Sequence, residues 1–207
     1  MTDPGSRILI IATRNSGKLR EFRGLLRPLD KTILGLEDLS ADAEVKESGG
    51  TFAENARLKA VGYSRITRHS VLADDSGLEV TALGLRPGIR SARYAGAGAS
   101  DADRVRKLLE EIKSAGKGRA ARFVCALALA QNGVLLSEAL GECLGIIIDE
   151  PRGANGFGYD PVFLFPELGK TFAELSDAEK NRYSHRAKAV ASLLEQIPLS
   201  PIGNRES

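Results

Sequence analysis

The stretch ILIIATRNSGKLREFRGLLRP at residues 8–28 decides the fold class. Its first five residues form a continuous apolar, β-rich run, which is typical of a strand buried on both faces. A polar loop follows, and apolar residues then recur at helical spacing from Leu19 to Leu26, until Pro28. We therefore predict the strand, loop and helix of an α/β protein. The loop opens onto a helix N-terminus, which suits an anion.

Length and charge exclude several classes of protein. Of the 207 residues 43% are hydrophobic and 27% charged, as in an ordinary globular domain, and no apolar run is long enough to cross a membrane. A net charge of +2 is too small for wholesale binding to a nucleic-acid polymer or a membrane. With two cysteines and no secretory signal pattern, we expect a cytoplasmic protein. We expect one domain over residues 1–207, with flexible tails at 1–6 and 199–207.

Capping signals predict three further helices. Thr51 and Glu54 have the form of a capping box, and Ser100 and Asp101 are the candidate caps before a second run of apolar residues at helical spacing. The last helix is expected to begin after Ser176 and to continue as one piece to Pro198.

A β-hairpin is predicted at Asn132-Gly133, the strongest short-range turn signal in the chain. A two-residue turn here places Cys125 opposite Leu140 and not opposite Cys143. We therefore expect two free thiols in the core.

Two adjacent acids are the first candidates for chemistry. A short apolar strand at residues 71–73 is expected to run into Asp74, Asp75, Ser76 and Gly77, which places the acids at a strand's C-terminal end. Adjacent side chains on an extended backbone point to opposite faces, so only one of the acids serves a given cleft. A carboxylate there suits Mg²⁺ bound together with substrate phosphates. A simple turn explains the same residues about equally well.

Two further charged segments have ordinary explanations when each is taken by itself. Glu44 and Glu47 fit a solvated loop, although a second metal ligand could come from it. Lys180, His185 and Arg186 fit a patch of surface charge at the last helix.

Two well-known motifs are missing. A P-loop needs Gly and Ser or Thr where this chain has Ala12 and Leu19. The nucleophile-elbow pattern G-x-S-x-G is also absent, which disfavours a hydrolase built on Ser76 and His185.

Six ordered blocks together resemble the inosine triphosphate/xanthosine triphosphate pyrophosphatase family, which removes deaminated purine nucleotides from the precursor pool. The blocks are TRNSGK, ESGGTFAENARLKA, LADDSGLEV, PGIRSARYAG, NGFGYDPVF and TFAELSDAEKNRYSHR, and they span nearly the whole chain. The resemblance implies a twisted mixed sheet with flanking helices, divided into two lobes around a nucleotide cleft. It also implies a homodimer.

The same resemblance implies a site. Asp75 would be a Mg²⁺ ligand and the proton acceptor, and Glu47 the other candidate metal ligand, although Lys46 stands where relatives carry an acid. The implied substrate contacts are Thr13, Arg14, Asn15, Ser16, Gly17, Lys18, Ser76, Phe157, Gly158, Tyr159, Asp160, Lys180, His185 and Arg186. Leu85 also departs from the family pattern, where Gly is common, but it touches no implied catalytic group.

The expected reaction is attack of water on the α-phosphorus of a purine nucleoside triphosphate, which releases pyrophosphate with Mg²⁺ as cofactor. Phe157 would stack on the base. Inosine and xanthosine triphosphates (ITP and XTP, or their deoxy forms) would be preferred over ATP, because Arg186 or protonated His185 would donate to a 6-oxo group. Two alternatives stay open: another nucleotide enzyme, such as a phosphatase or kinase, and a nucleotide- or RNA-binding module without catalysis.

Overall fold

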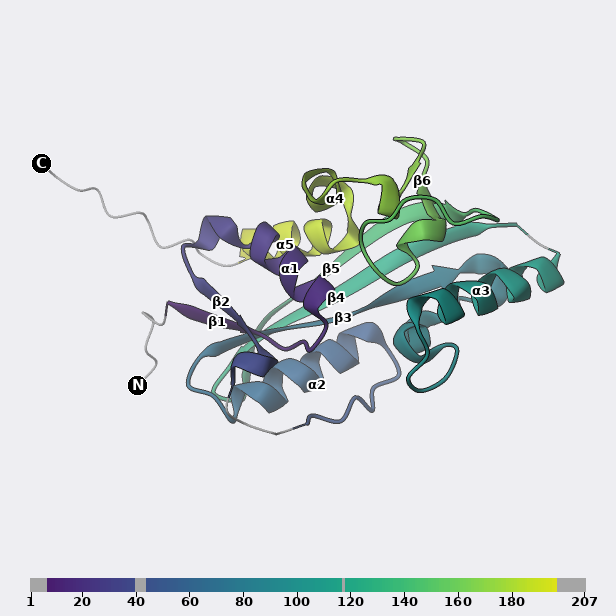
Figure 1. Cartoon of the computed structure of the whole chain (residues 1–207). Helices are drawn as coiled ribbons and strands as arrows, with labels where there is room; N and C mark the ends of the chain where they lie inside the picture. The colour runs from purple at the N-terminus through teal and green to yellow at the C-terminus, as the bar shows by residue number, and fades with distance from the viewer. Residues whose placement is uncertain (1–6, 40–43, 117, 197–207) are drawn as a thin grey trace, which may run out of the picture.

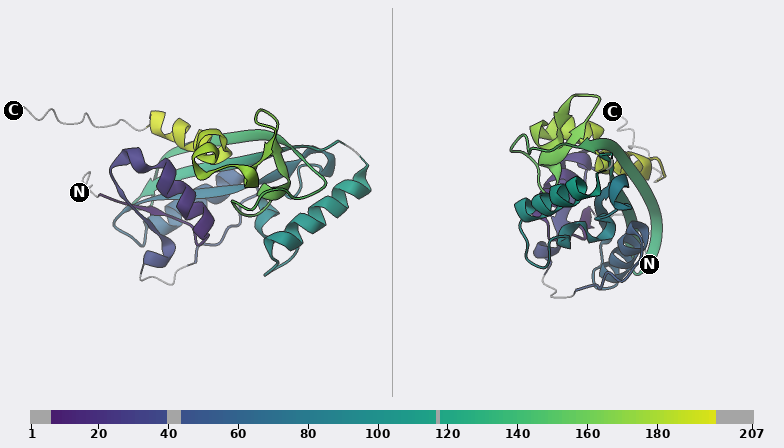
Figure 2. Two further views of the ribbon diagram at one scale, coloured as in Figure 1. Left: turned by 45° about the horizontal axis from the view of Figure 1, so that its top comes forward. Right: turned by 90° about the vertical axis from the view of Figure 1, so that its right-hand side faces the viewer.

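The computed structural model describes residues 7–39, 44–116 and 118–196, and it contains one seven-stranded mixed sheet with helices on both faces (Figure 1). The strand order is β2-β1-β3-β4-β5-β6-β7, and Figure 2 shows the sheet twisting along its length. The predicted α/β class and twisted mixed sheet are therefore confirmed. The predicted tails lie outside the described residues, and the division into two lobes stays a prediction.

The predicted strand, loop and helix are present at the start of the chain. β1 (Ile8–Ile11) pairs in parallel with β2 (Thr32–Gly35) and is almost fully buried. α1 (Ser16–Leu25) follows the polar loop, and its N-terminus is capped by the side chain of Asn15, which accepts from the Lys18 amide at 2.9 Å. The first turn of α1 therefore lies at the carboxyl end of β1.

β3 (Ser70–Val80) is longer than predicted, so the acids lie in the middle of a strand and not at its end. β3 runs parallel to β1 as far as Leu72, and then continues because β4 (Ala120–Gln131) pairs with it antiparallel along nearly its whole length. The prediction of a strand end was wrong because the partner strand extends the pairing. Asp74 and Asp75 still lie just beyond the carboxyl end of β1.

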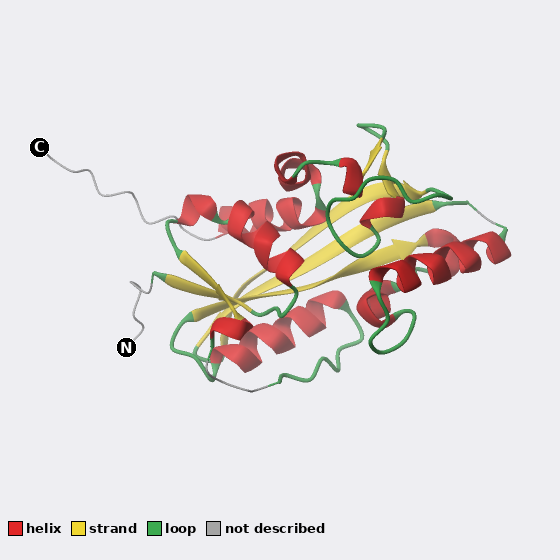
Figure 3. Ribbon diagram, in the orientation of Figure 1, coloured by secondary structure: helices red, strands yellow, loops and turns green. Residues whose placement is uncertain are grey.

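The predicted hairpin joins β4 to β5 (Val134–Ile147), and these two long strands span the sheet in Figure 3. Asn132 and Gly133 have positive φ angles of 52° and 78°, as expected for the tight turn that such dipeptides favour.

One detail of the predicted pairing was wrong. A bulge between Leu129 and Ala130 shifts the register, so that Cys125 lies opposite Gly141 instead of Leu140. Both cysteines are buried and free, as expected.

α2 (Phe52–Ser64) covers one face of the sheet, where its alanines pack on the alanine-rich face of β4. Its Thr51 cap is confirmed, since the hydroxyl accepts from the Glu54 amide at 3.1 Å. The Glu54 carboxylate accepts from Gly50 instead of returning to Thr51, so the predicted capping box is half formed. α3 (Asp101–Ala115) begins after its predicted Ser100 cap.

The last predicted helix is in fact two helices, α4 (Asp177–Tyr183) and α5 (His185–Gln196). Ser184 has an extended backbone, with ψ at 160°, and its hydroxyl accepts from the Ala187 amide as a cap for α5. The prediction failed because a serine in a helical pattern was not taken as a cap. The expected end at Pro198 lies outside the described residues.

The remaining elements are short. The strands β6 (Phe163–Phe165) and β7 (Lys170–Thr171) extend the sheet, and the 3-10 helices are η1 (Arg27–Leu29), η2 (Leu36–Asp38), η3 (Thr81–Leu83), η4 (Gly88–Arg93), η5 (Asp160–Val162) and η6 (Phe172–Glu174). Within the residues that the structure describes, none of the helices combines the length and the apolar character needed to cross a membrane.

α5 packs directly on the sheet face opposite α2 because Gly141 of β5 has no side chain. A Cβ atom at this position would lie 2.2 Å from the carbonyl oxygen of His185 and 2.3 Å from the amide nitrogen of Ala189. The obstacle is helix backbone, which cannot rotate away as a side chain can.

We therefore expect Gly141→Ala to lower the free energy of unfolding by about 2 kcal/mol or more, because α5 must move off β5. Gly118→Ala is the matched control, since apart from its chain neighbours no described residue has an atom within 4 Å of a Cβ at that position. Urea denaturation of both variants measures the difference. Equal stability of the two would contradict this account of the packing.

Candidate active site

Two hollows meet where β3 passes the carboxyl end of β1. One, the charged hollow, includes charged side chains from the first loop, residues 44–47, α2, β3 and η4. The other, the aromatic hollow, includes aromatic side chains from β4, residues 157–159 and α5, with charged side chains such as Asp101 and Arg104 beside them. Both hollows are lined by Asn15, Lys18, Ser76 and Ala92, so they lie side by side.

The carboxylates of the two adjacent acids of β3 have different partners, as expected for an extended backbone, but both residues line the charged hollow, so the prediction that only one serves a given cleft was wrong. Asp74 accepts from Lys18 Nζ at 2.7 Å and from Arg186 Nε at 2.9 Å. Asp75 accepts from Lys59 Nζ at 3.0 Å and from Asn55 Nδ2 at 3.2 Å, both on α2. The acids therefore have separate surroundings.

Asp74 belongs to a buried network of ion pairs. Arg186 also pairs with Glu21 at 2.8 Å, and Glu21 pairs in turn with Lys180 at 2.7 Å, which donates to Asp160 at 2.5 Å. Three carboxylates thus balance three cations, counting Lys18. The expectation that the basic residues at the last helix are surface charge was wrong.

The charges of this network are fixed by their neighbours. Burial alone would raise the pKa of Asp74, but Lys18 and Arg186 outweigh it and hold that pKa far below its usual range. Burial likewise opposes ionisation of Glu21, and Arg186 with Lys180 lowers its pKa nevertheless. Asp74 is therefore an ionised structural group with no capacity to accept a proton near neutral pH.

Asp75 has a less balanced environment. Its carboxylate shares the Lys59 ammonium with Glu47, whose Oε2 lies 3.3 Å from Lys59 Nζ. Two carboxylates therefore meet one cation. Burial raises the pKa of Asp75 to about 6, against the opposing effect of Lys59. Asp75 is thus suited to accept a proton near neutral pH, unlike Asp74.

The other hollow offers flat apolar surfaces. Phe157, Phe123 and Tyr159 line it, and the imidazole of His185 stacks on Phe123 with ring centres 4.8 Å apart. Such a space fits a planar heterocycle. Lys180 and Arg186 lie over the Phe157 ring at 4.9 and 5.3 Å from its centre, which fixes one side of that ring.

The expectation of a protonated His185 was wrong. Burial, together with the nearby cations Arg186 and Lys180, lowers the pKa of His185 well below its usual value, so the imidazole is neutral. Its Nδ1 atom is buried and has no hydrogen-bond partner among the described residues. The residue lines the aromatic hollow, although this nitrogen itself is shielded from solvent.

Most of the predicted site residues come together at the two hollows. Thr13, Arg14, Asn15, Lys18, Glu47, Asp75 and Ser76 line the charged hollow, and Phe157, Gly158, Tyr159, Asp160, His185 and Arg186 line the aromatic one. Ser16 and Gly17 form the first turn of α1, with Gly17 against the Phe157 ring. Lys180 is only 4% exposed, and its ammonium group lies over the Phe157 ring and donates to Asp160.

Sequence reasoning missed three residues that hold the acids. Lys59 and Asn55 contact Asp75, and Glu21 joins Lys180 to Arg186. A signal was present for Lys59, because it lies seven residues after Phe52 on the apolar face of its helix, where an unpaired ammonium is costly.

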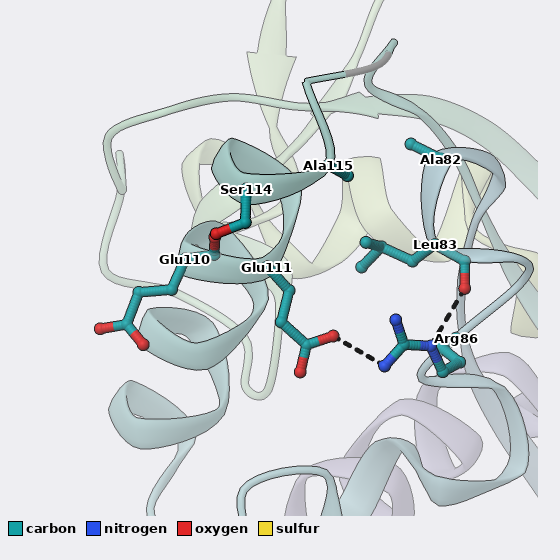
Figure 4. Close-up of a pocket in the computed structure, with 7 residues that line it drawn as sticks. All are labelled: Ala82, Leu83, Arg86, Glu110, Glu111, Ser114 and Ala115. Atoms are coloured by element: carbon teal, nitrogen blue, oxygen red, sulfur yellow. Dashed lines mark hydrogen bonds and ion pairs between the residues drawn. The ribbon is translucent and has the colours of Figure 1, made fainter.

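A hollow of about 670 Å³ lies elsewhere, between η3 and the end of α3 (Figure 4). Its basic group, Arg86, donates to Glu111 at 2.8 Å, and Glu111 also accepts from Tyr94. Among the described residues that line this hollow, the only cation is already paired, which makes it a poorer site for a phosphate than the charged hollow.

Comparison with known proteins identifies the family. The model of the Ham1 family matches residues 9–196. The chain belongs to the Ham1 family. Among similar Ham1 relatives, the dITP/XTP pyrophosphatase of Geobacillus kaustophilus is 51% identical over 189 residues, which cover 91% of this chain and 93% of that protein. The dITP/XTP pyrophosphatase of Thermus thermophilus is 50% identical, with 93% of each chain covered. These findings confirm the resemblance seen in the six sequence blocks.

Solved structures agree on the Ham1 fold. A HAM1 protein from Coxiella burnetii is 43% identical, with a TM-score of 0.81, over 90% of this chain and 95% of that one. A nucleoside-triphosphatase / dITP/XTP pyrophosphatase from Mycobacterium abscessus is 36% identical, with a TM-score of 0.70, over 93% and 98% of the two chains.

Loss of Asp74 is expected to destabilise the protein. Asp74→Ala leaves Lys18 and Arg186 without their shared buried partner, and the free energy of unfolding should fall by about 3–5 kcal/mol. Asp149→Ala is the control, because that carboxylate is 77% exposed in its pair with Arg119 and its loss should cost less than about 1 kcal/mol. Thermal and urea unfolding measure both. A fully stable Asp74→Ala variant would show that the network does not hold the fold.

Proposed function

We propose that this chain hydrolyses non-standard purine nucleoside triphosphates, such as ITP, XTP and their deoxy forms, to the monophosphate and pyrophosphate. The observation that carries the proposal is that an aromatic hollow and a charged one adjoin at Ser76, with Asp75 in the charged one. In the proposed binding mode a purine occupies the first and the triphosphate the second, with the α-phosphate near Ser76 and Asp75. The names of the similar dITP/XTP pyrophosphatases support the same substrate class.

The reaction breaks the bond between the α-phosphorus and the oxygen that bridges to the β-phosphate, while water forms the new bond to phosphorus. The Asp75 carboxylate accepts the proton of that water. Lys18, in the first turn of α1, and the free amides of that turn meet the phosphates. Lys59 holds Asp75 in place through its 3.0 Å contact.

The donor set fits a Mg²⁺ ion. Asp75 and Glu47 bring two carboxylates to one ammonium, so the local charge favours an additional cation. In the described part of the chain no group of three or more acidic, histidine or cysteine side chains is placed to hold a metal, and Mg²⁺ commonly takes one or two carboxylates plus phosphates and water. Bound there, it would neutralise charge on the phosphates.

Base selection is proposed to depend on the polar groups that face the aromatic hollow. Arg186 is buried and donates to Asp74, Glu21 and Ser76, so its position is fixed before substrate binds. His185 contributes a neutral imidazole to the wall of this hollow. Fixed donors fit the 6-oxo group of hypoxanthine and xanthine better than the 6-amino group of adenine.

The homodimeric state and the cytoplasmic location of the protein also remain predictions.

A substrate panel with pyrophosphate detection tests the function. We expect ITP and XTP to give a higher kcat/KM than ATP, with intact pyrophosphate as product and with activity lost on chelation and restored by Mg²⁺. Release of single phosphates would indicate a phosphatase instead. Tight nucleotide binding with no turnover in Mg²⁺ would favour the alternative of a binding module.

Asp75→Asn should lower kcat by at least about 100-fold, because the amide cannot accept the proton and is a poor metal ligand. Folding should be intact, since the amide can keep a hydrogen bond with Asn55 or Lys59. The measurement is steady-state turnover of ITP together with the melting temperature. Near wild-type kcat in a folded Asp75→Asn variant would rule out this role.

A further inference from the structure

Two arginines of the charged hollow have side chains without a partner among the described residues. Lys18 and Lys59 line it as well, but each is already paired with an acid of β3. The side chains of Arg14 and Arg93 have neither a hydrogen-bond nor an ion-pair partner among the residues that the structure describes. A triphosphate brings more negative charge than one free arginine balances, so both are available for it.

The backbone that carries Arg93 is held firmly against β3. Gly77 of β3 has no room for a side chain, because a Cβ there would lie 2.4 Å from Ser91 Oγ and 2.6 Å from the Gly88 carbonyl oxygen. The Ser91 hydroxyl accepts from the Leu78 amide at 2.9 Å and donates to the Gly88 carbonyl at 2.7 Å. The 3-10 helix η4 is therefore fixed directly beside Ser76 and Asp75.

Two further hydrogen bonds hold η4 in place. The Tyr159 hydroxyl donates to the Ser91 carbonyl at 2.9 Å, and Arg104 donates to the Ala92 carbonyl at 3.1 Å. Next along the chain, Tyr94 is buried. The backbone at Arg93 is thus preorganised, while its exposed guanidinium is unpaired.

We infer that Arg93 binds the β- and γ-phosphates of the substrate, and therefore the pyrophosphate that leaves. The aromatic hollow takes the base, and Arg93 lines only the charged hollow, together with Arg14. A guanidinium donates two parallel hydrogen bonds to phosphate oxygens and stays ionised throughout. Arg14 and Arg93 come from different elements, the first loop and η4, so the terminal phosphates connect these elements when substrate binds.

Arg90 provides a matched control on the same 3-10 helix. It is also an exposed arginine without a partner in the described part of the chain, but it lines a different hollow, with Thr51 and Phe52. Removing either arginine changes the net charge equally. Any difference in phosphate binding between the two variants therefore arises from the position of the arginine and not from the net charge of the protein.

The inference rests on the proposed function for its substrate, and it predicts a selective loss. Arg93→Ala should raise the KM for ITP about tenfold and raise the inhibition constant of pyrophosphate by a similar factor, as expected for one lost charge-assisted contact. The inhibition constant of inosine monophosphate should change less than about twofold. Arg90→Ala should behave as wild type, and both variants should keep the wild-type melting temperature because neither side chain has a partner to lose.

Calorimetric binding of pyrophosphate in Mg²⁺ separates this inference from the proposed function, because it needs no turnover. If the wild type binds pyrophosphate and Arg93→Ala binds it about tenfold more weakly, the inference holds even where ITP is not hydrolysed. If Arg93→Ala and Arg90→Ala bind pyrophosphate equally, or if the wild type does not bind it, the inference is overturned. An equal rise in the inhibition constants of pyrophosphate and inosine monophosphate would also overturn it.

Discussion

The contact between Arg186 and Asp74 is the interaction on which the rest of the site depends. It joins α5 to the middle of β3, and Arg186 extends it to Glu21 on α1 at 2.8 Å. Each of these side chains is nearly inaccessible to water, so separating any one of them leaves a buried charge without a partner, which costs several kcal/mol. Three elements that are far apart in the sequence are therefore held in one arrangement, and the aromatic hollow between them has a fixed shape.

This use of Asp74 determines what its neighbour can do. Because side chains alternate along a strand, the network on one side of β3 leaves Asp75 on the other, against α2. Asp74 has a pKa far below its usual range, whereas burial raises that of Asp75 to about 6. Two adjacent residues of the same type thus have opposite pKa shifts, one toward permanent ionisation and one toward protonation near neutral pH. The difference arises from the number of cations around each carboxylate.

Local signals in the sequence predicted the parts of the fold that depend on local interactions. The first strand and helix, the Ser100 cap and the hairpin turn at Asn132-Gly133 were all found, because each depends on residues a few positions apart. The extension of β3 and the register of Cys125 were not, because both depend on the pairing with a distant strand and its bulge. The break between α4 and α5 at Ser184 lies between these two cases, because a local signal for it exists but is ambiguous. Serine is an ordinary cap, but the helical pattern continues on either side of it.

The same distinction applies to the site. The acids and the first loop were predicted because their motifs are contiguous, whereas Lys59 and Glu21 act through partners elsewhere in the chain. Lys59 left a trace in the sequence, as a charged residue on an apolar helix face. Arg93 lies in the block PGIRSARYAG, but nothing in that block alone distinguishes it from another exposed arginine such as Arg90. Its position follows from the close approach of η4 to β3, which Gly77 permits, so a glycine two residues after Asp75 determines where this cation lines the charged hollow.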